Sequence, residues 1–501
     1  MKKFSRRAFL SDSFLAAAAI SVFGPVSVPQ KARAQDRPHG PNETLGVMLV
    51  GCGGRGYDHT LEYLKDSRTR ILCVCDPDPA HSARIADYIE ERTQKRPFEI
   101  RDMREGFDDR NIDIVSCAAP NHWHALCGVW AMQAGKDTYL EKPICHNVRE
   151  GQALAAAARK YGRCCQVGTQ GRSYSAVRQA AAYAAGGNLG EISLTRGLCY
   201  KRRRSIGALG VYPVPEGVDY SLWSGPAPVV DPMTRPKLHY DWHWQRLYGN
   251  GDMGNQGAHE IDLARLFLGE TEFPASVISY GGRLGYQAER NDDAYIDAGD
   301  TANTEVSIFG YRSGRSLVFE TRGLETDPLL DAKIGVIVYG SEGFIVESDY
   351  GLAAAFDNDG NETARFTGGD DNDHFRNFVD CVANRTPEKL SADARVGLLS
   401  AGLAHLGNIS YYMGEENRVS PAEAERVISG IPGQDDNIAT LRRTFDHLAA
   451  NGVDPERTPI SMGANLKFDP DSESFVGNSA ADAMLTRDYR DGFVVPNPEN
   501  V

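Results

Sequence analysis

A glycine-rich turn follows the first apolar run of the chain, at the spacing Gly51-x-Gly53-x-x-Gly56. Residues 45–50 before it are expected to form a strand, and residues 60–66 after it have helical spacing. Glycines in a strand-to-helix turn allow a tight bend and let backbone N–H groups approach a pyrophosphate at the helix N-terminus. The alternative is an ordinary glycine-rich turn that binds nothing.

A carboxylate stands at the end of the second apolar run, where Asp76 follows Gly56 by about 20 residues. At this position a carboxylate accepts hydrogen bonds from the adenosine ribose hydroxyls and repels a 2′-phosphate. The two signals together predict NAD as the cofactor and disfavour NADP. Gly54 and Arg55, inside the turn, are predicted to contact the cofactor along with the motif glycines.

Strand-like and helical segments alternate through the first part of the chain. The expected strands are residues 45–50, 70–75, 112–118 and 137–140, and the expected helices include residues 80–92 and 124–134. Such alternation is typical of a parallel sheet with helices on both faces. We therefore predict an α/β protein whose residues 45–166 form a Rossmann dinucleotide-binding domain.

The pattern changes after about residue 166. Four β-rich runs, at residues 306–309, 316–321, 333–339 and 343–347, have no helix between them, and helices are expected near 373–383 and 394–413. Consecutive strands joined by glycine turns indicate a largely antiparallel sheet with one face covered. Residues 167–445 are thus predicted to be a second α/β domain with an open sheet. Residues 446–501, rich in Pro and Asp, are treated as a C-terminal extension.

Composition narrows the class of protein. The 501 residues are enough for two or three domains. Asp and Glu number 68 against 54 Lys and Arg, and this acidic balance argues against a nucleic-acid partner. The ten cysteines include no Cys-x-x-Cys pair, which disfavours a zinc ribbon or a thioredoxin-like site, and we expect them to be buried thiols.

The N-terminus has the features of an export signal. Arg6 and Arg7 precede an Ala-rich apolar run at residues 14–28, and Ala32-Arg33-Ala34 offers a small-residue cleavage site. Paired arginines before such a run predict a twin-arginine signal over residues 1–34, and hence a periplasmic or otherwise exported protein. An amphipathic anchor or an uncleaved signal is the alternative. No later segment has the roughly 18 apolar residues of a membrane span.

Glu141-Lys142-Pro143 follows the strand expected at residues 137–140. The carboxyl ends of parallel strands are where ligands bind in doubly wound folds. Transfer of a hydride from a carbinol carbon requires a base for the hydroxyl proton, and a lysine serves if burial lowers its pKa. Taken alone, a lysine before a proline is more often an ordinary surface residue.

Six motifs occur in a specific order, and their combination resembles the Gfo/Idh/MocA oxidoreductase family over roughly residues 45–415. They are the glycine turn, Asp76, Pro120-Asn-His-Trp-His124, Glu141-Lys-Pro143, Gly168-Thr-Gln170 and Gly254-Asn-Gln-Gly-Ala-His259. The twin arginines and the segments Trp223–Pro226 and His239–Trp244 are similar to those of an exported branch of this family. The resemblance implies a Rossmann domain, a second domain whose sheet forms the substrate face, and chemistry on a sugar or polyol.

The resemblance also implies roles for individual residues. Lys142 and His259 correspond to the catalytic pair, and Asn121, His124, Glu141 and again Lys142 correspond to residues near the cofactor. One departure concerns the family's Asp-x-x-x-His pattern, because here Asn255 replaces the aspartate. An amide cannot raise the basicity of an imidazole as a carboxylate does, so the acid–base role of His259 is open to question. Asp252 or Glu260 are the candidates to compensate.

Further polar residues are predicted to contact the substrate. They are Gln170, Tyr200, Lys201, His239, His243 and Asn255. His239, Asp241 and His243 would share one face of a strand, which allows substrate contact, structural hydrogen bonds or, least favoured, a metal; we predict no metal. Trp242 and Trp244 are candidates either to stack on a sugar ring or to fill the core. Residues 201–204 form a basic run that either grips an anionic group or is simply solvated.

The leading hypothesis is an NAD-dependent oxidoreductase acting on a sugar, polyol or sugar derivative, in a homo-oligomer. An exported enzyme would lack a working NAD pool, so a retained cofactor is expected. One rival is a redox-neutral glycosidase that oxidises its substrate, eliminates a group and reduces the product back. The other rival is a sugar-binding protein without catalysis.

Overall fold

The computed structural model describes residues 44–501, so the predicted export signal lies outside the described residues. Its first sheet has six parallel strands in the order β3-β2-β1-β4-β5-β6. The strands are β1 (Leu45–Val50), β2 (Thr69–Cys75), β3 (Phe98–Ile100), β4 (Ile114–Cys117), β5 (Asp137–Leu140) and β6 (Cys165–Val167). This is the order of a dinucleotide-binding Rossmann sheet, as predicted.

Both faces of this sheet are covered, which explains why its central strands are apolar without alternation. Packed against one face are α5 (Asn121–Gln133) and α6 (Val148–Tyr161). The other face packs against α2 (Gly54–Lys65), α3 (Pro79–Thr93) and α12 (Asp371–Asn384). The short helix α4 (Arg104–Phe107) lies between β3 and β4 in the chain. The predicted helix at residues 373–383 therefore belongs to the first sheet in space, although it is remote in sequence.

The second sheet contains 12 strands and is mixed but mostly antiparallel, which confirms the predicted fold class. Only β7 and β10 pair in parallel on its main path. Its longer strands are β7 (Ile192–Cys199), β8 (Ser276–Gly282), β9 (Thr304–Gly310), β10 (Ser316–Arg322), β11 (Ile334–Gly340), β12 (Gly343–Asp349), β13 (Leu352–Asp357) and β14 (Glu362–Thr367). The remaining strands, β15 (Arg418–Val419), β16 (Ile460–Met462), β17 (Leu466–Asp469) and β18 (Ser474–Phe475), are short.

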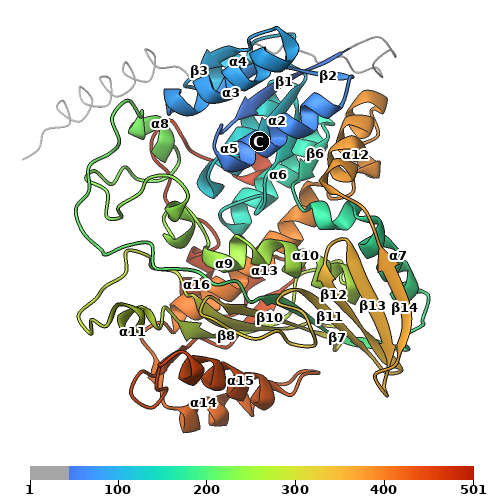
Figure 1. Ribbon diagram of the computed structural model, residues 1–501, viewed down its shortest axis with the longest axis vertical. Helices are drawn as coiled ribbons and strands as arrows, with labels where there is room; N and C mark the ends of the chain where they lie inside the picture. Colours follow the sequence, from blue (N-terminus) through green and yellow to red (C-terminus); the bar gives the residue numbers. More distant parts are fainter. Residues whose placement is uncertain (1–43) are drawn as a thin grey trace, which may run out of the picture.

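Helices α10 (Gly257–Leu268) and α13 (Ala394–Met413) lie between the two sheets (Figure 1). Helix α7 (Ser175–Ala185) packs against β13 and β14 at one edge of the second sheet. Helix α13 is apolar on almost every side and packs against both α6 and β8. A helix without a polar face is one buried on all sides, so α13 joins the two halves of the molecule. No helix of residues 44–501 has the length and apolar character needed to span a membrane.

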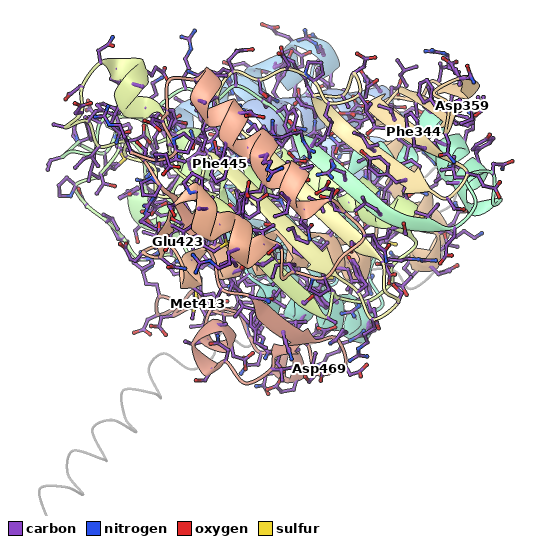
Figure 2. The ribbon with its side chains drawn as sticks, turned by 90° about the horizontal axis from the view of Figure 1, so that it is seen from below. Phe344, Asp359, Met413, Glu423, Phe445 and Asp469 are labelled. Carbon is purple, nitrogen blue, oxygen red and sulfur yellow. The ribbon has the colours of Figure 1, made fainter. Side chains whose placement is uncertain are left out.

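The outer face of the second sheet is partly covered by α14 (Pro421–Ile428) and α15 (Asn437–Ala450). Figure 2 shows both helices crossing one part of the sheet, with Phe344 on the part that they leave uncovered. The buried contact joins Ile428, Leu441 and Leu448 to side chains of β8, β9 and β10.

The C-terminal segment is more regular than its composition indicates. Helix α15 crosses residue 446, and β16, β17, β18 and α16 (Ser479–Ala483) follow it. Strands of two to four residues leave too short a pattern to read from sequence. The chain then returns to the Rossmann domain, where Val501 is buried and its carbonyl oxygen accepts a hydrogen bond from Lys160 Nζ (Figure 1).

Candidate active site

A cavity of about 430 Å³ lies at the carboxyl ends of β1, β2, β4 and β5. Opposite these strand ends, it is closed by residues 219–245, which we call the cover segment. The cover contains α8 (Tyr220–Ser224) and the single turn Asp241–Trp244. Its residues on the cavity wall are Leu222, Trp223, His239, Tyr240, Trp242 and His243.

Hydrogen bonds at two places hold the cover on the Rossmann domain. The Asp219 N–H donates to the Pro77 carbonyl oxygen at 3.0 Å, beside the end of β2. Trp123 Nε1 donates to the carbonyl oxygens of Leu222 and Trp223, both at 3.1 Å. The sequence did not indicate this cover, because irregular segments carry no periodic pattern.

The glycine turn has the geometry that its motif predicts. Gly51 has φ +85°, and a Cβ there would lie 2.6 Å from the Ala119 nitrogen. A Cβ on Gly56 would lie 2.0 Å from the Gly51 carbonyl oxygen, so Gly56 packs inside the turn and is not on the cavity wall. Gly53 and Gly54 line the cavity at the start of α2, and a Cβ on either would meet nothing within 4 Å. This space at a helix N-terminus fits a dinucleotide pyrophosphate.

Asp76 is buried at the end of β2 and lines the same cavity. Its Oδ2 accepts a hydrogen bond from the Cys52 N–H at 2.7 Å, and its Oδ1 accepts one from the Asp78 N–H at 2.9 Å. The glycine turn itself therefore fixes the carboxylate. Its position is the one at which an acidic residue binds the adenosine ribose in Rossmann folds.

Glu141 is the centre of a buried charge cluster. Its Oε1 accepts hydrogen bonds from Arg55 Nε at 2.6 Å and His59 Nε2 at 3.1 Å. Burial opposes the charge, but Arg55 and His59 outweigh it and hold the pKa of Glu141 well below its usual range. Arg55 also lies 3.4 Å from Asp371. His59 was missed from sequence; its position four residues after Arg55, on the same helix face, is the signal that could have identified it.

Lys142 projects toward the substrate side of the cavity. Its Nζ donates to the Asn255 carbonyl oxygen at 3.1 Å and lies 3.4 Å from Asn255 Oδ1. Burial lowers the pKa of Lys142, while Glu141 partly opposes that shift. A lysine with a lowered pKa is suited to accept a proton from a hydroxyl group.

His259 and Glu260 lie beneath this lysine, at the start of α10. Neither lines the cavity. Burial, together with the charge of Lys142, holds the pKa of His259 well below its usual value, so the imidazole is neutral. Burial raises the pKa of Glu260 to about 7, and Tyr350 donates a 2.9 Å hydrogen bond to it.

Asp252, the other residue considered as a replacement for the missing aspartate, has a different partner. Arg203 forms an ion pair with it at 2.7 Å, and both side chains are buried. Arg203 belongs to the basic run 201–204, so this arginine is neither a solvated residue nor free to bind an anion. Lys201 Nζ donates to Gln256 Oε1 at 2.9 Å and is not on the cavity wall.

The structure places the other predicted cofactor residues as follows. Asn121 lines the cavity, and its Nδ2 donates to Asn250 Oδ1 at 3.1 Å. His124 also lines it, but both ring nitrogens lie 2.7 Å from backbone carbonyl oxygens, of Pro143 and Ala119. His124 therefore joins two loops of the site and has no free nitrogen to offer a ligand.

Three of the six predicted substrate residues reach the cavity: His239, His243 and Asn255. His243 Nδ1 lies 2.5 Å from the Tyr240 carbonyl oxygen, which makes Nδ1 the donor and leaves Nε2 as an acceptor. Its ring stacks on Trp242 with centroids 3.6 Å apart. Residues 241–244 form a helical turn, so the expected strand face shared by His239, Asp241 and His243 does not exist.

The remaining substrate predictions fall outside this cavity. Tyr200 donates a 2.7 Å hydrogen bond to Glu320 and lines a separate cavity below the sheet, beside α15. It follows β7, and its side chain points to the face of the sheet that packs against α15, away from the cofactor motif. Gln170 lies beside Asp371, behind the ion pair of Arg55 and Asp371, and does not line the cavity.

All ten cysteines are buried free thiols, as expected.

Comparison with known proteins agrees with this arrangement. Residues 45–169 match the model of an oxidoreductase family with an NAD-binding Rossmann fold, Gfo/Idh/MocA. This part of the chain is therefore similar to the NAD-binding domain of that family.

The curated relatives are distant. Levoglucosan dehydrogenase of Pseudarthrobacter phenanthrenivorans is 26% identical over 248 residues, which cover 47% of this chain and 54% of that protein. A glycosyl hydrolase family 109 protein of Shewanella pealeana is 25% identical over 178 residues, covering 33% of this chain and 39% of that protein. The matches thus span about half the length of these relatives or less.

Solved structures share the fold over more of the chain. A levoglucosan dehydrogenase in complex with NADH and levoglucosan has a TM-score of 0.53 at 20% identity, covering 73% of this chain and 96% of that one. The WlbA dehydrogenase from Bordetella pertussis, in complex with NADH and UDP-GlcNAcA, has a TM-score of 0.52 at 18% identity, covering 73% and 95%.

Proposed function

We propose that this protein is an NAD-dependent oxidoreductase that acts on a sugar, polyol or sugar derivative and retains its cofactor between turnovers. The observation that carries the proposal is a single cavity that joins the glycine turn and Asp76 at one end to Lys142 and Asn255 at the other. A dinucleotide fits the first end, and its nicotinamide would supply the hydride acceptor or donor near the second.

The residues of this chain supply binding and proton transfer. Gly53 and Gly54 offer backbone N–H groups to the pyrophosphate, and Asp76 offers its carboxylate to the adenosine ribose. Lys142 Nζ takes the proton of the substrate hydroxyl and returns it in the reverse direction. The Asn255 carbonyl oxygen orients the lysine, and Glu141 with Arg55 keeps the adjoining charge fixed.

Two features support a carbohydrate substrate. Next to Lys142 the cavity is lined by Trp242 and by His243, whose Nε2 is free to accept a hydrogen bond from a hydroxyl. A flat apolar ring beside hydrogen-bonding groups suits the apolar face and polar edge of a sugar. The relatives named for levoglucosan and UDP-GlcNAcA support the same class of substrate.

Retention of the cofactor is supported by the cover segment. The cover is hydrogen-bonded both at Pro77, beside the adenosine end, and at Trp123, in the first turn of α5. A dinucleotide between the cover and the sheet could leave only after these bonds break. Retention would also suit an exported enzyme, and we propose export by the twin-arginine pathway from Arg6, Arg7 and the apolar run that follows.

The test is to purify the protein without added cofactor, denature it and identify the released nucleotide by mass spectrometry. We expect NAD in near-stoichiometric amount. Recovery of NADP would contradict the assignment of Asp76, and an empty protein that rebinds and releases NAD freely would contradict retention.

A redox-neutral glycosidase is the second candidate, favoured by the similarity to glycosyl hydrolase family 109 proteins. A ketone formed transiently on the sugar acidifies the neighbouring C–H bond and allows elimination of the glycosidic group. Free reducing sugar released from a glycoside without net NADH would establish this reaction. Binding of a sugar without either reaction would instead indicate a protein that has lost catalysis.

A further inference from the structure

Two histidines and an aspartate converge at the adenosine end of the cavity. The ligand atoms of Asp78, His81 and His239 all lie within 4.8 Å of one another, and all three side chains are half-buried. His239 Nε2 is 2.9 Å from Asp78 Oδ2, and the rings of His81 and His239 are 4.2 Å apart between centroids. Nothing in the predicted dinucleotide chemistry requires two imidazoles at this place.

The two carboxylate oxygens of Asp78 have different partners. Oδ1 accepts the Ala80 N–H at 3.0 Å and so caps the N-terminus of α3. Oδ2 faces the two histidines, at 2.9 Å from His239 and 4.0 Å from His81 Nε2. The cap fixes the carboxylate, and its second oxygen is directed at the imidazoles.

The donor set determines the kind of ion. Two imidazole nitrogens and one carboxylate oxygen suit Zn²⁺ and similar transition metals, whereas Ca²⁺ and Mg²⁺ prefer oxygen donors alone. Zinc held tetrahedrally has ligands at about 2.0–2.2 Å, so donor atoms that already lie within 4.8 Å of one another need only side-chain adjustments to bind it. Three protein ligands leave a fourth position for water, on the side where His81 and His239 line the cavity.

The three residues come from both sides of the cofactor cavity. Asp78 and His81 lie at the start of α3 in the Rossmann domain, and His239 lies in the cover segment. The Asp219–Pro77 hydrogen bond joins the same two segments close by. A metal at this point would tie the cover to the Rossmann domain beside Asp76.

We propose that Asp78, His81 and His239 form a transition-metal site, selective for Zn²⁺ over Ca²⁺ and Mg²⁺, that fastens the cover over the cofactor cavity. The metal site itself stands on the geometry of these three side chains. Its effect on cofactor release rests on the proposed function.

The first experiment titrates the purified full-length protein, treated with chelator and dialysed, with Co²⁺ as a spectroscopic probe and with Zn²⁺ as competitor. We expect one Co²⁺ per chain with visible absorption bands of tetrahedral or five-coordinate geometry, displaced by Zn²⁺ but not by Mg²⁺. His239→Ala and His81→Ala should each weaken binding by roughly 10–100-fold or more. Asp87→Asn, which alters an exposed carboxylate on the same helix α3, should bind as the unaltered protein does.

Absence of a one-to-one complex, or equal binding by His239→Ala and His81→Ala, would overturn the proposal. The second experiment follows NAD release with Zn²⁺ present and after addition of chelator. We expect chelator to speed release from the unaltered protein and to leave the His239→Ala rate unchanged. If no NAD is bound at all, the proposed function fails while the metal titration still decides the site.

Discussion

At the scale of single residues, the site is defined by Glu141 and Lys142, two neighbours whose pKa values are both lowered. Glu141 stays charged because Arg55 and His59 donate to it, and Lys142 has a lowered pKa because it is buried. A fixed negative charge beside a lysine that readily loses its proton is suited to proton transfer. The sequence motif places the two residues side by side, but only the surroundings set their protonation.

Replacing Lys142 by Met should remove proton transfer and keep most of the packing. We expect kcat to fall by about 10²–10⁴-fold, with the amount of bound NAD unchanged. Steady-state kinetics and mass spectrometry of the released nucleotide measure the two quantities. A protein that only binds sugar would show no turnover in either form, and this variant would keep its affinity for the sugar.

The activity should also depend on pH through the same lysine. Lys142 acts as a base only when deprotonated, so kcat/KM for oxidation should rise as pH rises through its pKa. Because burial lowers that pKa, the midpoint should lie below the value of about 10.4 for a free lysine. A profile without such a limb, measured up to pH 10, would argue that another group takes the proton.

Asp76 is expected to determine whether the protein prefers NAD or NADP. Asp76→Ser removes the charge that repels a 2′-phosphate, so the ratio of NADP to NAD affinity should rise by about tenfold or more. Titration of the stripped protein with each cofactor measures that ratio. An unchanged ratio would mean that the ribose lies elsewhere.

At the scale of elements, the connection between β7 and α10 forms the wall that closes the cavity opposite the strand ends. Near its start, Arg203 is buried against Asp252 of α9 (Gly251–Gly254). The connection then continues as the cover over the cavity. Ion pairs and backbone hydrogen bonds hold this connection, together with a buried apolar cluster that includes Tyr220, Trp223 and Tyr248. Polar side chains of the cover, such as His239 and His243, line the cavity.

Arg203→Met should therefore be strongly destabilising. Removal of one partner leaves the Asp252 charge buried and unpaired, a loss that typically costs about 3–5 kcal/mol. Denaturant unfolding measures it. The control Arg96→Met breaks exposed ion pairs, which solvent screens, and should destabilise the protein much less; equal losses in the two variants would contradict the argument.

At the scale of the whole molecule, two sheets share the helical layer that contains α13, and the second sheet has an outer face that is only half covered. The stacked rings of Phe344 and Phe356, with centroids 5.0 Å apart, lie on β12 and β13, beyond the reach of α14 and α15 (Figure 2). We propose that a second copy of the chain covers this part and forms a homo-oligomer.

Phe344→Lys tests that proposal, because a charge in an apolar interface is costly and Phe344 is partly exposed in the single chain. Light scattering coupled to gel filtration should show a dimer or tetramer for the unaltered protein and a smaller species for the variant. Glu423→Lys, at an exposed position of α14 itself, should leave the mass unchanged. A monomeric unaltered protein would refute the proposal.

The parts of the fold and site that could be predicted are those encoded by local pattern. The glycine turn, Asp76 and the strand–helix alternation each depend on residues a few positions apart. Tyr200 shows where this fails: it directly precedes Lys201 in the chain, yet its side chain faces a different cavity, on the opposite face of the sheet. Its direction depends on the pairing of β7 with β10 and β11, which no local pattern encodes.

The sequence by itself thus determined the Rossmann domain, the cofactor-facing turn and the Glu141–Lys142 pair, because backbone conformation and motif spacing are local properties. Only the tertiary structure decided that α12 packs on the first sheet, that Asp252 belongs to Arg203 and that residues 219–245 close the cavity. It also brought Asp78 and His81 to His239, across a separation of more than 150 residues. These contacts depend on how distant segments bury their surfaces and charges together, which becomes defined only when the whole chain is folded.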